Sequence, residues 1–137
     1  MSTQLEDALA AVDLFASLSR RQVKKLVGAG RDVRSPAGKA LAKEGLGALA
    51  FHVVLDGSAE VSRGGQPLRT LGPGDYFGEI SMIDGKPRSA TVTAASELTT
   101  FAIPHTDFAR LIERDTELSS ALLVALCARL RQAEARA

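Results

Sequence analysis

Three residues, Gly78, Glu79 and Arg88, have types and a spacing that suit a ligand carrying a phosphate. Gly78 permits backbone conformations closed to other residues and lets a ligand approach the main chain closely. The stretch from Glu79 to Ile83 can form one helical turn, whose first N–H groups lack backbone partners and attract an anion. Arg88 adds a planar fork of donors that matches two phosphate oxygens. The spacing therefore predicts an anion site.

Glu79 needs a role of its own, because a carboxylate beside a phosphate would repel it. A ribose 2′-hydroxyl can donate a hydrogen bond to the Glu79 carboxylate, while the helix start and Arg88 offset its charge. The segment thus predicts a pocket that binds phosphate and ribose together. Taken alone, Gly78-Glu79 is an ordinary turn into a helix, and Arg88 is a solvated strand residue or an ion-pair partner of Asp84. A degenerate segment that keeps the fold without a ligand stays open as an alternative.

Two short helices are expected over residues 3–30, ahead of any β structure. Thr3 to Glu6 and Ser19 to Gln22 both fit capping boxes. Gly28 and Gly30 supply stop signals for the second helix. Four apolar residues at helical spacing are assigned to the first helix: Leu5, Leu9, Val12 and Phe15.

From residue 31 to 104 the texture changes to short alternating stretches punctuated by glycine. Phe51 to Leu55 reads as a strand whose odd positions share one face, and Ala59 and Val61 repeat the alternation after the Asp56-Gly57 turn. The turn spacing predicts about eight antiparallel strands in a jelly roll, also called a double-stranded β-helix. The lack of intervening helical patterns argues against a parallel α/β sheet.

Helices return over residues 105–137. Thr106 or its neighbour is a candidate cap for the first of them, and Asp115 or Thr116 for the long last one. An apolar stripe on the last helix leaves three roles open: packing on the roll, closing over a ligand as a lid, or pairing with a second copy. Its members are Leu118, Leu122, Leu126 and Leu130, widened by Leu123 and Cys127.

The composition fits one globular domain of 137 residues with a formal charge of +1. That balance provides no general field for nucleic acid or an anionic membrane. A single cysteine, Cys127, excludes an intramolecular disulfide and suggests a small packing hydrophobe in a reducing compartment. Without a signal-like start or a long apolar run, the sequence predicts a cytoplasmic protein that binds neither membrane nor, by this chain alone, nucleic acid.

Catalysis and metal binding find little support in the sequence. His52 and His105 each stand alone, whereas a metal-bearing β-barrel needs clustered His and Glu ligands. No Ser-His-Asp or Cys-His pairing occurs at suggestive spacing. We therefore expect a protein that is not an enzyme and holds no metal or cofactor.

The stretch from Gly72 to Ile80, followed by Pro87 to Val92, resembles the phosphate-binding cassette of cyclic-nucleotide-binding domains. Leu14 to Ser19 and Val54 to Val61 resemble the family's first helices and its hairpin, so the resemblance covers nearly the whole chain. It implies a β-roll flanked by helices that binds cyclic AMP or cyclic GMP. We favour cyclic AMP, because it is the commoner ligand among such proteins.

The resemblance also implies a role for each residue of the cassette, which spans residues 77–90. It assigns Glu79 to the 2′-hydroxyl, Arg88 to the cyclic phosphate and a long C-terminal lid helix to the base. The candidate cassette residues are Gly78, Glu79, Ile80, Ser81, Arg88, Ser89 and Ala90. Apolar contacts to the base are expected from Val61 on the roll, and the lid candidates are Leu122, Leu126, Arg129 and Leu130.

Three functions are compatible with these features. The first is a sensor or regulatory module whose nucleotide-bound surface is recognised by a protein effector. The second is the sensor part of a transcription regulator without its DNA-binding domain. The third is a structural module with a cassette that binds nothing.

Overall fold

The computed structural model describes residues 3–43, 45, 50–78 and 90–136. In these ranges, eight strands form two four-stranded sheets, and every strand pair is antiparallel. The first sheet has the order β1-β8-β3-β6 and the second the order β2-β7-β4-β5. The strands are β1 (Arg31–Ser35), β2 (Ala40–Ala42), β3 (Ala50–Asp56), β4 (Ala59–Arg63), β5 (Gln66–Leu71), β6 (Tyr76–Phe77), β7 (Thr91–Ala94) and β8 (Leu98–Pro104). The predicted jelly roll is confirmed.

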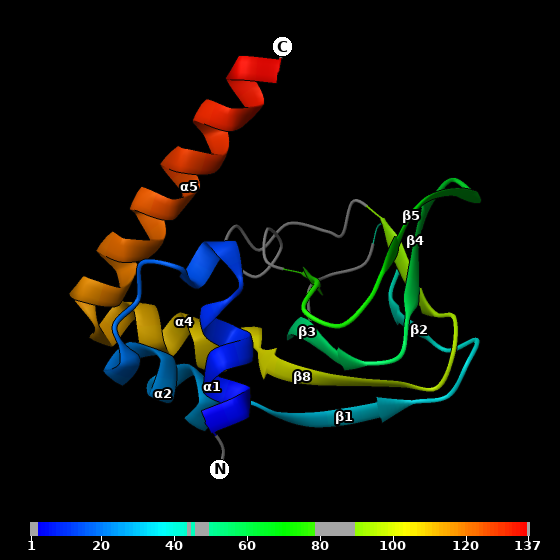
Figure 1. The fold of residues 1–137 in the computed structure, drawn as a ribbon, viewed down its shortest axis with the longest axis horizontal. Coiled ribbons are helices and arrows are strands. Elements are labelled where there is room, and N and C mark those ends of the chain that lie inside the picture. The colour runs from blue at the N-terminus through cyan, green and yellow to red at the C-terminus, as the bar shows by residue number, and fades with distance from the viewer. Residues whose placement is uncertain (1–2, 44, 46–49, 79–89, 137) are drawn as a thin grey trace.

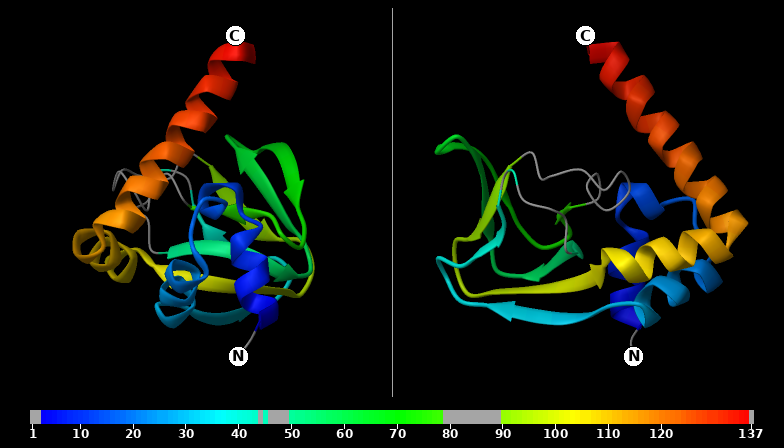
Figure 2. Two further views of the ribbon diagram at one scale, coloured as in Figure 1. Left: turned by 60° about the vertical axis from the view of Figure 1, so that its left-hand side comes forward. Right: turned by 180° about the vertical axis from the view of Figure 1, so that it is seen from behind.

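Helices gather at one end of the two sheets, and the last helix extends away from them (Figures 1 and 2). They are α1 (Thr3–Ala10), the 3₁₀ helix η1 (Asp13–Phe15), α2 (Arg20–Gly28), α4 (His105–Arg114) and α5 (Thr116–Arg136). No helix in the described ranges is long and apolar enough to cross a membrane.

Strand β3 contributes side chains to both hydrophobic cores. Phe51 and Val53 pack against the helices, whereas Val54 faces the interior of the roll, where it joins Ala59 and Val61. The expected alternation along this strand is therefore present, and neither of its faces is left to solvent over these residues. Because one strand serves both cores, the helical layer and the roll are fixed relative to each other.

The start of α2 follows the sequence pattern. Ser19 Oγ accepts a hydrogen bond from the Gln22 N–H at 3.2 Å, and Gln22 Oε1 accepts one from the Ser19 N–H at 2.9 Å. This reciprocal pair is the predicted capping box.

The first predicted helix is wrong in its extent, because α1 begins at Thr3 and ends at Ala10. The chain becomes extended at Val12 and then forms η1, which contains Leu14 and Phe15. Val12, Leu14 and Phe15 are all buried in the same core. A continuous helix would spread neighbouring positions around its axis, so burying all three requires the chain to leave the helical path.

The predicted cap at Thr106 or its neighbour is also wrong, because α4 begins at His105, directly after β8, and Pro104 is its N-cap without a side-chain bond. Asp115, in contrast, caps α5: its Oδ1 accepts a hydrogen bond from the Leu118 N–H at 3.0 Å. On α5, Leu118 and Leu122 are buried, whereas Cys127 is exposed, so its prediction as a packing hydrophobe is wrong. Ala125 and Leu126 still pack on the helical core at this point of α5, whereas Cys127 lies on the helix face that carries the exposed Leu123 and Val124.

Gly57 lies in the predicted Asp56-Gly57 turn, and its conformation can be tested by substitution. Its φ is +91°, and an added Cβ would meet the carbonyl oxygen of Glu97. We expect Gly57→Ala to lower the free energy of unfolding by roughly 3 kcal/mol, since backbone strain and a clash with main chain add. Gly38→Ala is the matched control, with a φ of +89° and open space around the new Cβ; strain alone predicts about 1–2 kcal/mol there. Equal losses in urea unfolding of the two variants would contradict the clash.

Candidate functional site

The predicted cassette connects the two sheets. Its first residue, Phe77, ends β6 of the first sheet and is followed by Gly78, and its last residue, Ala90, directly precedes β7 of the second. Gly78 has a φ of +91°, in the region that favours glycine. Ala90 is half-buried and packs against the core of the roll. The segment between them thus begins and ends on different sheets of the roll.

Val61 lies close to the described end of the cassette. It pairs with Val92 of β7, and its neighbour Ser62 pairs with Thr91, the residue after Ala90. The Val61 side chain is only 3% exposed and belongs to the core of the roll. Val61 is therefore adjacent in space to one end of the predicted site, as an apolar wall residue should be.

The chemically decisive residues of the prediction lie outside the described residues. These are Glu79, Ile80, Ser81, Arg88 and Ser89. Their assignment to phosphate and ribose stays a prediction from the sequence.

Three of the four lid candidates line one cleft between η1 and the far half of α5. Leu126, Arg129 and Leu130 form its α5 side, Asp13 belongs to its opposite side, and its volume is about 520 Å³. The Tyr76 hydroxyl donates a hydrogen bond to the Asp13 carboxylate. Because Tyr76 lies two residues before Gly78, this bond ties the beginning of the cassette to one wall of the cleft.

Leu122, the fourth lid candidate, lies elsewhere. It is 5% exposed and packs in the helical core with Phe108 and Leu118. The leucine stripe of α5 therefore has two parts. Leu118 and Leu122, near the start of the helix, are buried, whereas Leu126 and Leu130 lie at the cleft, where Leu130 is 61% exposed.

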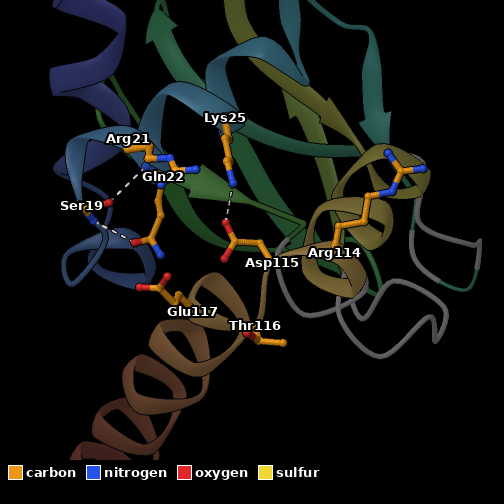
Figure 3. Close-up of a pocket in the computed structure, with 8 residues that line it drawn as sticks. All are labelled: Ser19, Arg21, Gln22, Lys25, Arg114, Asp115, Thr116 and Glu117. Carbon is orange, nitrogen blue, oxygen red and sulfur yellow. Dashed lines mark hydrogen bonds and ion pairs between the residues drawn. The ribbon is translucent and has the colours of Figure 1, made fainter.

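A polar pocket of about 280 Å³ lies where α2 meets the junction of α4 and α5 (Figure 3). Lys25 Nζ donates to Asp115 Oδ2 at 2.8 Å, while Arg114 points away from this pair. The hydrogen bond from Lys25, and next the one from the Leu118 N–H, lower the pKa of Asp115. The ion pair fastens α2 to the start of α5. Sequence reasoning found Asp115 as a cap, but no local signal could have linked it to a lysine 90 residues away.

Comparison with known proteins identifies the family. The family model described as "Cyclic nucleotide-binding domain" matches residues 32–115. This chain belongs to the cyclic nucleotide-binding domain family. The resemblance noted in the sequence is thereby confirmed, and residues 32–115 include both described ends of the cassette.

Relatives of this cyclic nucleotide-binding domain include regulatory proteins and channels. A cAMP-dependent protein kinase regulatory subunit from Emericella nidulans is 36% identical over 123 residues, which cover 84% of this chain and 30% of that protein. A cyclic nucleotide-gated potassium channel from Rhizobium etli is 32% identical over 114 residues, covering 83% of this chain and 32% of the channel. The domain thus spans about a third of the length of these curated relatives.

Solved structures agree with the fold. The N-terminal domain of a transcriptional regulator from Streptomyces coelicolor A3(2) has a TM-score of 0.86 and 31% identity, covering 95% of this chain and 94% of that one. The catabolite activator protein of Thermus thermophilus has a TM-score of 0.74 and 31% identity, covering 90% of this chain and 61% of that one.

The Lys25–Asp115 pair predicts a pH-dependent contribution to stability. A carboxyl whose pKa is lowered by folding stabilises the native state above its ordinary pKa, and that stability is lost as the pH falls through the lowered value. We expect Asp115→Asn to lower the melting temperature at pH 7, and the difference from the unaltered protein to shrink below a pH of about 4. Glu117→Gln removes a carboxylate from the same helix start and is the control. A melting-temperature difference that stays constant down to pH 2 would contradict the assignment.

Proposed function

We propose that this domain binds a cyclic nucleotide monophosphate, and that it acts as a sensor or regulatory module without catalysing a reaction. The observation that carries the proposal is the pair of cassette ends. Gly78, with its φ of +91°, leaves one sheet, and Ala90 enters the other. The sequence between them holds Glu79 and Arg88 at the spacing expected for ribose and phosphate.

The affinity must come from more than these two side chains. Micromolar binding requires about 8 kcal/mol, whereas a hydrogen bond to a charged group contributes roughly 1.5–3 kcal/mol. Burial of the base against apolar side chains is the natural source of the rest. Val61 on the roll, with Leu126 and Leu130 on α5, offers such surface next to the described end of the cassette and along the η1–α5 cleft.

Cyclic AMP is the favoured ligand. The relative from Emericella nidulans is the regulatory subunit of a cAMP-dependent protein kinase. It is 36% identical to this domain over 123 residues. The Ser89 hydroxyl can bond either a phosphate or the amino group of guanine in a syn nucleotide, so cyclic GMP is the competing ligand to test.

The far half of α5 supports a lid. A ligand shifts a helix only if it binds the closed arrangement better than the open one. The exposed Leu130 and the η1–α5 cleft supply a surface that could gain contacts on closure. The altered surface would then be read by a protein effector in the same cytoplasmic compartment.

A second role for α5 rests on its exposed residues. Leu123 and Val124 are each 63% exposed, and Leu130 follows on the same helix. Leu123 and Leu130 are seven residues apart, a spacing that suits pairing with a second copy of the helix.

The match to the N-terminal domain of a transcriptional regulator keeps the sensor part of such a protein as the alternative function.

Isothermal titration calorimetry with cyclic AMP and cyclic GMP tests the function. We expect binding with micromolar or tighter affinity, stronger for cyclic AMP. Arg88→Ala should weaken it at least about a hundredfold, because both phosphate oxygens lose their charged partner.

The control for Arg88 is Lys86→Ala, which removes the same charge from the same segment. We expect it to change affinity by less than about fivefold, because no ligand contact is assigned to Lys86. If neither nucleotide gives heat at a protein concentration of about a hundred micromolar, the nucleotide-binding function is wrong. The structural module that binds no nucleotide is then the remaining interpretation.

Two serine substitutions on α5 separate the lid from the dimer. Leu130→Ser should weaken nucleotide binding by about tenfold if Leu130 covers the base, and it should also weaken a dimer that pairs through Leu130. Leu123→Ser should convert a dimer to a monomer in sedimentation equilibrium, with the affinity unchanged. If the unaltered protein is monomeric with and without nucleotide, pairing through α5 is wrong. If Leu130→Ser binds nucleotide normally, Leu130 is not part of a lid.

A further inference from the structure

Strand β3 holds the chain at the point where it enters the predicted cassette. The Val54 N–H donates to the Asp75 carbonyl at 2.8 Å, and the Gly74 N–H donates to the Val54 carbonyl at 2.9 Å. Tyr76 and Phe77 then form the whole of β6, paired with Val53 and His52 of β3. A strand of two residues has few ladder bonds of its own, so side-chain contacts must help to hold it.

His52 provides such a contact. Its ring stacks on the ring of Phe77, with centroids 4.8 Å apart and planes inclined by 8°. Nδ1 of His52 also shares a hydrogen bond of 2.9 Å with Oγ1 of Thr100 on β8. His52 is 8% exposed and Thr100 fully buried, so this polar contact lies inside the protein.

The chemistry of this contact argues for a purpose beyond packing. An apolar side chain would fill the site without the cost of removing an imidazole from water. What the imidazole adds is orientation. The torsion that sets the plane of an aromatic ring is intrinsically broad, and the bond to Thr100 restricts it. The ring of Phe77, which is 5% exposed, therefore stacks on an imidazole ring whose plane is held in one orientation.

We propose that His52 is a positioning residue: held by Thr100, it fixes Phe77 and thereby the direction in which the chain leaves β6 through Gly78 into the cassette. This role rests on the proposed nucleotide-binding function. Gly78 follows Phe77 directly with a φ of +91°. A displacement of Phe77 would therefore change the direction in which the chain continues through Gly78.

Three variants of the whole chain separate the ring from its hydrogen bond. His52→Asn keeps a polar group near Nδ1 but removes the ring, His52→Phe restores a ring without the bond, and Thr100→Val removes the bond from the other side. We expect His52→Asn to weaken cyclic AMP binding by about tenfold, a size typical of coupled neighbours. His52→Phe should recover part of that loss, and Thr100→Val should cost about threefold.

A double-mutant cycle shows whether His52 acts through Phe77. In a Phe77→Leu background the stack is already gone, so adding His52→Asn should weaken binding by less than about threefold. The protein contains one tyrosine and no tryptophan, so the fluorescence of Tyr76 reports the environment of β6. We expect that signal to change in His52→Asn before any ligand is added.

The control is Ile103→Val, a buried change on the opposite face of the same sheet, within the helical core. It should lower the melting temperature with affinity unchanged. If the His52 variants melt earlier but bind cyclic AMP within about twofold of the unaltered protein, their role is structural and the proposal is overturned. If His52→Asn does not fold, His52→Phe and Thr100→Val decide the same question. If the unaltered protein binds neither cyclic AMP nor cyclic GMP, the proposed function fails first, and the positioning role fails with it.

Discussion

The structure depends on β3 being buried on both faces. One face of this strand carries Phe51 and Val53 into the helical core, and the other carries Val54 into the core of the roll. Because side chains alternate along a strand, a shift of one residue would exchange the two sets and disrupt both cores at once. The register of β3 therefore also fixes where its neighbours lie, including β6 and the start of the cassette.

The same constraint divides α5 into two halves. Its near half is held by Leu118 and Leu122 in the helical core and by the Lys25–Asp115 pair at its first turn. Its far half lies beside η1 and then extends away from the two sheets (Figure 1). A helix anchored at one end can change its direction at the other without unpacking the core. Such an arrangement suits an element whose position responds to a ligand.

Sequence reasoning succeeded where a structural rule is local. The capping box at Ser19, the cap at Asp115 and the glycine turn at Gly57 each depend on residues within a few positions of one another. It failed where distant contacts decide the outcome. The break in the chain after Ala10 follows from burying Leu14 in the same core as Val12 and Phe15. The exposure of Cys127 follows from its position on the face of α5 that the helical core does not cover. The ends of the candidate site could be predicted because a family motif covers them, whereas the cleft between η1 and α5 arises only from the fold.

Base selectivity is the property least determined by the cassette. Apart from Ser89, its predicted contacts reach only the phosphate and the ribose, which cyclic AMP and cyclic GMP share, so most of any preference must come from groups outside the cassette that touch the purine. The polar side chains at the η1–α5 cleft include Asp13, Arg129 and Gln132. Asp13 already accepts a hydrogen bond from Tyr76, which leads directly to the cassette. A base that reached this carboxylate would have to share it with Tyr76, so recognition of the base and the position of β6 would be linked through one side chain.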